Sequence, residues 1–336
     1  MVGVIALGVV LAPQAQAHEA IVTVNCPSGT DADYPSITAA LNALNALDLD
    51  GPHTIIVKGT CPGRLFIGDG ENLSPRGITI AAAEGETAIV EPPAAGAGAG
   101  VVVSIGQAQG ILLIGLVIRG GAIGLQVFDL SEVDTVGLTI EDNAVRGVDV
   151  YGNSMLFFSG QTVIQNNGTV GVRARGGSRV FFLAGGLGFP GAAEVHGHSL
   201  WGLTAEAGAV IEVRGPHQFH DNGTAGNATS GGIKISRTSE LLVTSNILGN
   251  PGFSNNAGPG ILVETGSSAS LLGATLSNNA GAGAHVQRLS IAELTSPNTF
   301  SDNGGSAISC DNSSWIAGDL TGIKPISCIN VVKPPK

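Results

Sequence analysis

The sequence predicts an all-β solenoid, in which short strands wind into stacked coils. A motif of glycine, an apolar residue, any residue and an apolar residue recurs every 23 to 31 residues between Gly124 and Cys310. A period of this length with strand-like alternation is typical of stacked repeats. The 51 glycines carry no three-residue period and 43% of the residues are hydrophobic, so the glycines indicate turns in a β-rich fold.

Residues 1–17 have the features of an export signal. They are apolar and end in Ala15-Gln16-Ala17, the small-x-small pattern of a cleavage site. We therefore expect a signal peptide over 1–17, a single domain over 18–336, and a secreted, periplasmic or cell-surface protein. The usual basic segment is missing, which would follow from a true translation start upstream of Met1. The alternative interpretation of this stretch is an apolar first strand. Elsewhere the sequence has no stretch long and apolar enough to span a membrane.

A helix is predicted over 35–47, at the N-terminal side of the repeats. Ile37, Leu41, Leu44 and Leu47 share one face, and Pro35 suits a first helical turn. An open end of stacked strands would expose core residues and unpaired backbone, so we expect this helix to cap the solenoid.

Each coil contains three predicted strands, and the coils are most regular over 124–310. In the coil that begins at Gly147, strands are expected over 147–151, 154–158 and 162–165. Alternation directs the second and fourth residues of the motif into the interior and the third residue outward. Residues 311–336 are expected to form a C-terminal cap.

A pair of Asn or Asp-Asn residues precedes most copies of the motif. The pairs are Asp142-Asn143, Asn166-Asn167, Asp221-Asn222, Asn255-Asn256, Asn278-Asn279 and Asp302-Asn303. Asn and Asp tolerate left-handed turns and can form hydrogen bonds with backbone or with one another along a stack. We predict a structural role for these pairs.

The four cysteines lie in two pairs at opposite ends of the chain. Of the three possible connectivities, only Cys26 with Cys61 and Cys310 with Cys328 avoids spanning the length of a solenoid. Two disulfides are expected rather than free thiols or a zinc site, because an exported protein meets an oxidising compartment and the sequence contains no C-x-x-C.

Several segments resemble the right-handed parallel β-helix, or pectin-lyase-like, superfamily, and in particular exported bacterial proteins with parallel β-helix repeats. These segments are VTVNC at 22–26, PSITAALNAL at 35–44, TIIVKGTC at 54–61 and HDNG at 220–223. The resemblance implies a right-handed parallel β-helix. It leaves the function open, because the superfamily includes polysaccharide lyases, glycoside hydrolases, uronan epimerases, adhesins and proteins with no known activity.

The motifs of individual enzyme families are mostly missing. The galacturonan hydrolase motifs have partial echoes only at His196-Gly197-His198 and Ile233-Lys234, and the Asp-Pro-His-Asp of uronan epimerases is nearest to Gly215-Pro216-His217. Calcium-dependent pectate lyases use clustered acidic ligands, and the sequence has no such cluster, so no cofactor is predicted and calcium lacks support.

Four histidines come close together in the sequence without forming a recognisable metal motif. They are His196, His198, His217 and His220. No third ligand with a supporting acid can be identified beside them, so turn or surface roles are expected and no metal site is predicted.

The third position of the motif predicts an outward row of side chains along the solenoid. Its members are Gln126, Asp149, Arg173, Thr204, Lys234, Leu262, His285 and Ser309. The resemblance implies that this strand carries a substrate groove. We therefore expect catalytic roles for Asp149, Arg173, Lys234 and His285, the last because imidazole is the side chain best suited to acid–base catalysis near neutral pH. Substrate-binding roles are expected for Gln126, Thr204, Arg175 and Arg237.

A binding site is most strongly predicted on the middle coils. They are lengthened near 185–193, 223–230 and 247–253, and insertions on a solenoid often gather where it binds. Seven basic and five acidic residues lie between Arg146 and Arg237, in a chain whose net charge is −11. An acidic polysaccharide would find a favourable patch there. In the alternative interpretation these charges maintain solubility, and Asp149 forms a cross-coil ion pair with Arg173.

Two functions follow. The first is a secreted polysaccharide-binding or polysaccharide-modifying protein, with lyase, epimerase or hydrolase activity. The second is a catalytically silent structural or adhesive surface protein, favoured by the missing motifs and by an aromatic content of 4%. A polysaccharide or surface glycan is the expected partner, and nucleic acid is not, because of the net negative charge. A monomer is expected.

Overall fold

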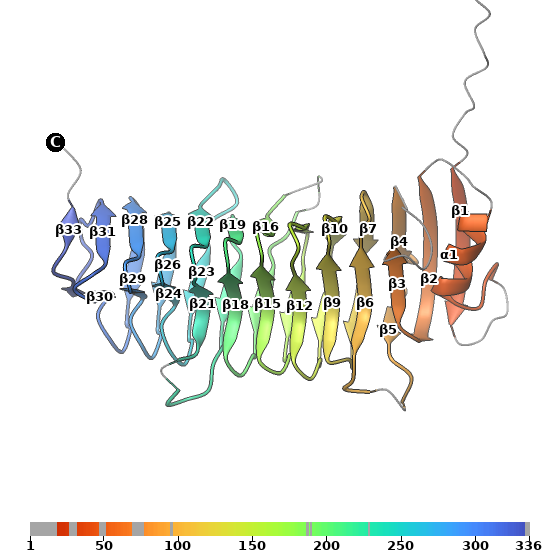
Figure 1. Cartoon of the computed structure of the whole chain (residues 1–336), viewed down its shortest axis with the longest axis horizontal. Helices are drawn as coiled ribbons and strands as arrows, with labels where there is room; N and C mark the ends of the chain where they lie inside the picture. Colours follow the sequence, from red (N-terminus) through yellow and green to blue (C-terminus); the bar gives the residue numbers. More distant parts are fainter. Residues whose placement is uncertain are drawn as a thin grey trace, which may run out of the picture.

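The computed structural model describes residues 19–26, 32–46, 52–68, 77–94, 97–185, 188, 190–227 and 229–332. The expected signal peptide and Leu47 of the expected helix lie outside these residues. The strands stack along one long axis, and the two ends of the described chain lie at opposite ends of the stack (Figure 1). In the described part of the chain, no helix has the length and apolar character needed to cross a membrane.

Each regular coil contributes one strand to each of three parallel columns, which confirms the predicted solenoid with three strands per coil. The first column is an 11-stranded sheet. Its strands are β3 (Leu65–Gly68), β6 (Val101–Gly106), β9 (Ile123–Phe128), β12 (Arg146–Val150), β15 (Val170–Arg175), β18 (Trp201–Glu206), β21 (Gly231–Ile235), β24 (Ile261–Glu264), β27 (Ala284–Gln287), β30 (Ile308–Cys310) and β32 (Ile326–Ser327).

The other two columns join through the long strand β2 into a 22-stranded sheet. The second column contains β1 (Ala20–Cys26), β2 (His53–Pro62), β4 (Ile78–Ala82), β7 (Ile111–Ile114), β10 (Glu132–Val136), β13 (Met155–Ser159), β16 (Arg179–Leu183), β19 (Val210–Arg214), β22 (Glu240–Thr244), β25 (Ser268–Leu272), β28 (Ile291–Thr295), β31 (Trp315–Gly318) and β33 (Val331–Val332). The third contains the end of β2, then β5 (Ala88–Glu91), β8 (Leu116–Arg119), β11 (Thr139–Glu141), β14 (Val163–Gln165), β17 (Glu194–His196), β20 (Gln218–His220), β23 (Gly252–Ser254), β26 (Thr275–Ser277) and β29 (Thr299–Ser301).

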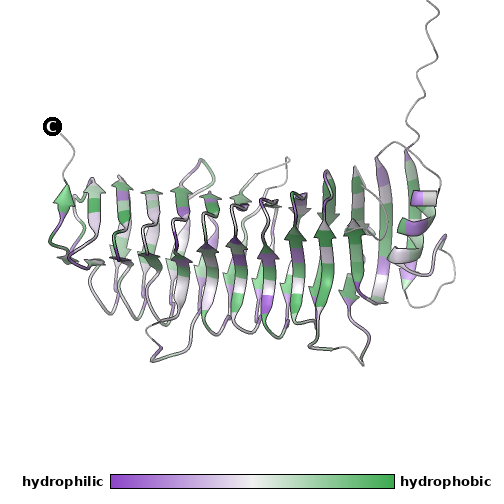
Figure 2. Ribbon diagram, viewed as in Figure 1, coloured by the Kyte–Doolittle hydropathy of each residue, from purple (hydrophilic) through white to green (hydrophobic). Residues whose placement is uncertain are grey.

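The interior is filled by the residues that alternation directs inward. Val148 and Val150 of β12 are fully buried, as are their register partners Leu125 and Val127 on β9. Phe158 and Phe182 stack on adjacent coils with ring centroids 4.9 Å apart. Figure 2 shows hydrophobic residues on strands from one end of the stack to the other. The core is therefore a continuous column of apolar layers.

The helix α1 (Ile37–Ala46) lies at the N-terminal end of the stack, beside β1 (Figure 1). It begins at Ile37 because the Ser36 hydroxyl accepts a hydrogen bond from the Ala39 amide, which is the usual role of a serine N-cap. Ile37, Leu41 and Leu44 are buried in the same core as the strands. The predicted capping helix is confirmed.

The two residues of each Asn pair have different structural roles. The first residue adopts a left-handed conformation, with φ near +53° at Asp142, Asn166 and Asp221. The second residue is buried, except for the half-buried Asn303 of the last pair, and bonds to its counterpart one coil away. For example, Asn143 Nδ2 donates to Asn167 Oδ1 over 2.9 Å. The resulting row, here named the ladder, comprises Asn143, Asn167, His198, Asn222, Asn256, Asn279 and Asn303. The predicted structural role is confirmed.

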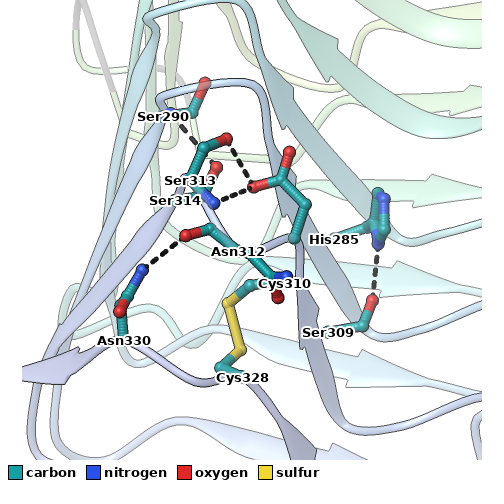
Figure 3. The surroundings of a disulfide bond; sticks show 10 residues. His285, Ser290, Ser309, Cys310, Asn312, Ser313, Ser314, Cys328 and Asn330 are labelled. Atoms are coloured by element: carbon teal, nitrogen blue, oxygen red, sulfur yellow. Dashed lines mark hydrogen bonds between the residues drawn. A yellow bond between two sulfur atoms is a disulfide. The ribbon is translucent and has the colours of Figure 1, made fainter.

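The disulfides join neighbouring coils at the two ends of the stack. Cys26 at the end of β1 bonds to Cys61 of β2. Cys310 at the end of β30 bonds to Cys328, which directly follows β32 (Figure 3). Both pairings agree with the sequence-based prediction.

Candidate functional site

The register of the 11-stranded sheet aligns the predicted outward residues in one row. Asp149 pairs with Gln126 on one side and with Arg173 on the other. The row continues through Thr204, Lys234, Leu262, His285 and Ser309. Successive members stand about 4.8 Å apart, the spacing of hydrogen-bonded strands.

Asp149 is on the outer side of its strand but is covered by two arginines. Its side chain is 2% exposed, and its carboxylate lies 3.5 Å from Arg146 and 3.4 Å from Arg175. The Arg175 guanidinium also lies 4.4 Å from the centre of the Tyr151 ring. Within the described residues, the ion pairs of Asp149 are with these two arginines, so the predicted pairing with Arg173 is wrong. Arginine side chains reach diagonally across the sheet, past the nearest register partner.

The same arrangement, one carboxylate bound by two cations, occurs twice more on this face. Glu206 lies 3.0 Å from Arg173 and 3.9 Å from Arg237. Glu264 lies 2.8 Å from Lys234 and 3.2 Å from Arg288. The three clusters together contain six cations and three carboxylates, which leaves an excess of three positive charges. They are centred on β12, β18 and β24, which are alternate coils.

The pKa of Glu264 shows how firmly its cluster is held. Partial burial is the largest single effect and raises the pKa of this carboxyl, but the hydrogen bond and charge of Lys234, the hydrogen bond of Gln287 and the charge of Arg288 together lower it more. The pKa therefore lies below its usual value, and Glu264 is ionised at neutral pH. Lys234 and Arg288 are held beside a permanent negative charge.

A groove of about 480 Å³ runs along the outer face of β18, β21, β24 and β27. Its lining includes Trp201, Lys234, Leu262, Glu264, His285, Arg288 and Ser309. Trp201 and Leu262 pack together with Val170, outside the main core, and give the groove an apolar part. A second hollow of about 170 Å³ adjoins it at Lys234, Glu264 and Arg288 and extends to Arg237 and Glu206.

The hydrogen bonds of His285 determine where its proton lies. Gln287 Nε2 is 2.9 Å from the Glu264 carboxylate, which can only accept, so the amide nitrogen of Gln287 faces Glu264. Gln287 Oε1 therefore faces His285 Nε2, 3.2 Å away, and Nε2 carries the proton. His285 Nδ1 is left with its lone pair toward the Ser309 hydroxyl at 2.5 Å (Figure 3). His285 is thus oriented as a base toward Ser309.

The comparisons with known proteins support the fold seen in the structure. A family model described as "Right handed beta helix region" matches residues 196–319. The chain adopts the right-handed parallel β-helix fold. The structure of pectate lyase Pel9A aligns with a TM-score of 0.54 and 14% identity, covering 94% of this chain and 78% of the lyase. A mannuronan C-5 epimerase A-module from Azotobacter vinelandii aligns with a TM-score of 0.42 and 13% identity, covering 89% of this chain and 94% of the module. A search of curated proteins gives no match.

The predicted site residues of the β-helix fall into two groups. Lys234 and His285 line the groove, and Arg237 lines the adjoining hollow. Gln126, Asp149, Arg173 and Arg175 lie further along the face, and Thr204 is buried in the row between Arg173 and Lys234. Among the residues that the structure describes, the buried Thr204 hydroxyl and Arg173 Nε have no hydrogen-bond partner.

Sequence reasoning missed Trp201, Glu264 and Arg288. Glu264 is two residues after the third motif position, so alternation already placed it on the outer face. A search of that second outward position would have found it. Arg288 follows the end of β27, beyond the reach of the alternation rule.

The three lengthened segments of the β-helix lie on two sides of the solenoid. The segment Gly223–Ser230 precedes β21, and its Thr229 lines the groove. The segment Ile247–Phe253 connects the second and third columns, and its Leu248 lies against Gly185 of the remaining insertion. Figure 1 places the first of these below β21 and the second above β22. In their described residues, two of the insertions therefore do not line the groove.

His198 and His217 have structural positions. His198 occupies the ladder, where Nδ1 accepts a hydrogen bond from the Asn167 amide, and Gly197 before it takes the left-handed turn. His217 Nδ1 accepts from the Ala193 amide over 2.8 Å. Burial lowers the pKa of each to about 4. The His-Gly-His string thus forms a turn, as expected for a structural role.

Proposed function

We propose that this β-helix binds an acidic polysaccharide along the outer face of the 11-stranded sheet. The observation that carries the proposal is the repeated cluster of two cations on one carboxylate, at Asp149, Glu206 and Glu264. These clusters give the face an excess of positive charge in a chain whose net charge is −11. A polyanion would be attracted to this face and repelled elsewhere.

The spacing of the clusters matches a regular polymer. Alternate coils are about 10 Å apart, close to the length of two sugar rings in an extended chain. A polyuronate lying along the solenoid axis would present a carboxylate to each cluster in turn. Trp201 and Leu262 would contact the apolar faces of the sugar rings inside the groove.

Two of the six cations can bind a ligand and still keep their ion pairs. The side chains of Arg237 and Arg288 are 71% and 66% exposed, and each touches its carboxylate through one guanidinium nitrogen. Because these side chains are mostly exposed, their remaining N–H groups are available to bind a sugar carboxylate in bidentate fashion. The other partner in each cluster, Arg173 or Lys234, is more buried and neutralises the charge of Glu206 or Glu264.

The resemblance to other proteins supports a glycan partner only at the level of the fold. The aligned structure is a pectate lyase by name, and pectate is an acidic polysaccharide. The clusters described above are a separate line of support, because they come from this chain alone.

Calorimetric titration with polygalacturonate, alginate and neutral dextran tests the proposal. We expect binding of the two polyuronates, weakened by salt, and none of dextran. Arg237→Ala and Arg288→Ala should each weaken binding about five- to tenfold. The control is Arg179→Ala, an exposed arginine on the second column. Equal weakening by the control, or no binding to either polyuronate, would contradict the proposal.

A second candidate, modification of the bound glycan, is favoured by His285. Its Nδ1 lone pair makes it a base inside the groove, and Arg288, which lines the same groove, could hold a uronate carboxylate. Lyase turnover would produce an unsaturated sugar with ultraviolet absorbance, and His285→Ala should abolish it while binding persists. Binding without turnover on any uronan would support the silent, adhesive alternative.

We also propose an extracytoplasmic location. Two disulfides at the ends of the solenoid fit an oxidising compartment. If residues 1–17 are removed on export, mass spectrometry of the secreted protein should find a mature N-terminus at His18.

A further inference from the structure

A second row of polar side chains lies on the third column, on a different face from the groove. His196 of β17 is in register with His220 of β20, and their rings stack with centroids 4.8 Å apart and planes 9° apart. Glu194 is two residues before His196 on the same strand, so both side chains are on the same side of the sheet. One ligand atom from each of the three residues lies within 4.8 Å of the others.

Asp221 supplies a supporting acid that the sequence did not reveal. Its Oδ2 lies 2.7 Å from His220 Nδ1. This contact keeps the proton of His220 on Nδ1 and leaves the lone pair on Nε2. Histidines that bind metals commonly donate their second N–H to a carboxylate in this way. Asp221 can hold this position because it occupies the left-handed turn before the ladder, with φ at +54°.

The two histidines are also accessible. Both rings are partly exposed, so an ion can reach them from solvent.

We propose that Glu194, His196 and His220 form a binding site for a divalent transition-metal ion of the zinc class. Two imidazoles and one carboxylate are ligands that zinc prefers, whereas calcium and magnesium take oxygen ligands only. Metal–ligand bonds of about 2.0–2.2 Å require the three side chains to rotate toward one another. The fourth coordination position is open to water or a ligand, and the ion links the adjacent coils through β17 and β20.

Titration of tag-free, chelator-treated protein with Zn²⁺, followed by calorimetry, tests this site. We expect one ion per chain, no comparable binding of Ca²⁺, and a higher melting temperature with Zn²⁺ because only the folded chain holds the site. His196→Ala and His220→Ala should each abolish the binding. Gln165→Ala, the neighbour of His196 in the same row, should leave it unchanged.

The Asp221→Asn variant distinguishes a metal site from a pair of histidines that stack only for structural reasons. Asn occupies the equivalent turn at Asn166 and Asn255, so the variant should fold. Loss of the carboxylate should weaken Zn²⁺ binding about 10- to 100-fold, with circular dichroism unchanged. Failure of the wild type to bind Zn²⁺, or binding that survives both histidine substitutions, would overturn the proposal. Glycan binding plays no part in these readouts, so the two proposals fail independently.

Discussion

His198 shows what one residue contributes to the stacked coils. It stands in a row of asparagines and reproduces their two main interactions, accepting from the Asn167 amide through Nδ1 and donating its own amide to Asn222 Oδ1. Its Nε2 faces the Ile164 carbonyl, 3.1 Å away. Unlike asparagine, histidine can gain a charge, and the ladder is buried. Because His198 stands where the other coils have asparagine, this otherwise neutral row contains one side chain that can be protonated at low pH.

This response leads to a prediction about pH. Burial lowers the pKa of His198 and of His217 to about 4, from an ordinary value of 6.5. The fold favours the neutral forms, so their contribution to stability is complete above pH 6.5 and is lost as the pH falls toward 4. The loss should be about 3 kcal/mol for each histidine by pH 4.

Urea unfolding of the wild type and His198→Asn at pH 7.5 and pH 4.5 measures this effect. Asparagine restores the ladder chemistry of the other coils without a titrating group, so the variant should lose less stability on acidification. His220→Asn, at a partly exposed position, serves as the control. An identical loss in His198→Asn and the wild type would show that His198 does not titrate with folding.

At the scale of elements, the ladder fixes the turns between the third column and the 11-stranded sheet. Asn222 is fully buried, and its side chain donates to the Val195 carbonyl and to Asn256 Oδ1 while accepting from the His198 amide. Asn222→Ala would leave several of these buried groups unpaired. We expect a loss of about 2–4 kcal/mol in the free energy of unfolding, since each unsatisfied buried group costs about 1–3 kcal/mol.

Asn227→Ala is the matched control for that measurement. Asn227 lies five residues further along the chain, in the surface loop before β21, and bonds within the loop to Thr229. Its removal should cost about 0.5 kcal/mol or less. Equal losses in the two variants, measured by urea unfolding at pH 7.5, would mean that the ladder is no more important than a surface turn.

The element scale is also where sequence reasoning was most reliable. Alternation fixed which side chains point outward, and the repeat fixed the register that aligns Asp149 with Arg173 and Lys234 with Leu262. Neither rule could predict that Asp149 would pair with Arg175, because the partner of a long side chain depends on its rotamer and its length. Nor could either rule place Glu194 beside His220, since the turn lengths that bring β17 and β20 into register are irregular there.

For the whole molecule, the consequence of stacking is that each coil is held only by its neighbours. An end coil has one neighbour instead of two, so opening should start at the ends. The disulfides Cys26–Cys61 and Cys310–Cys328 tie the terminal segments to the coil next to them. They therefore act where the stack is weakest.

Hydrogen exchange can locate this effect. Replacing Cys26 and Cys61 together by serine should lower the local stability of β1, β2 and α1 by about 3–4 kcal/mol in the chain-entropy account of disulfides. Amide exchange should accelerate in these elements and remain unchanged in β12, β15 and β18. Uniform acceleration along the whole chain would show that the protein unfolds as one unit.

The three-sided coil also changes how size and burial are related. In a compact domain the buried fraction rises with chain length, because volume grows faster than surface. Here each added coil brings the same apolar layer and the same outer surface, so the buried fraction per residue stays constant and only the length increases. A longer relative would gain no thicker core. It would gain further hydrogen-bonded residues in the ladder and a longer outer face. The length of a linear partner that this molecule can contact is therefore set by the number of its coils.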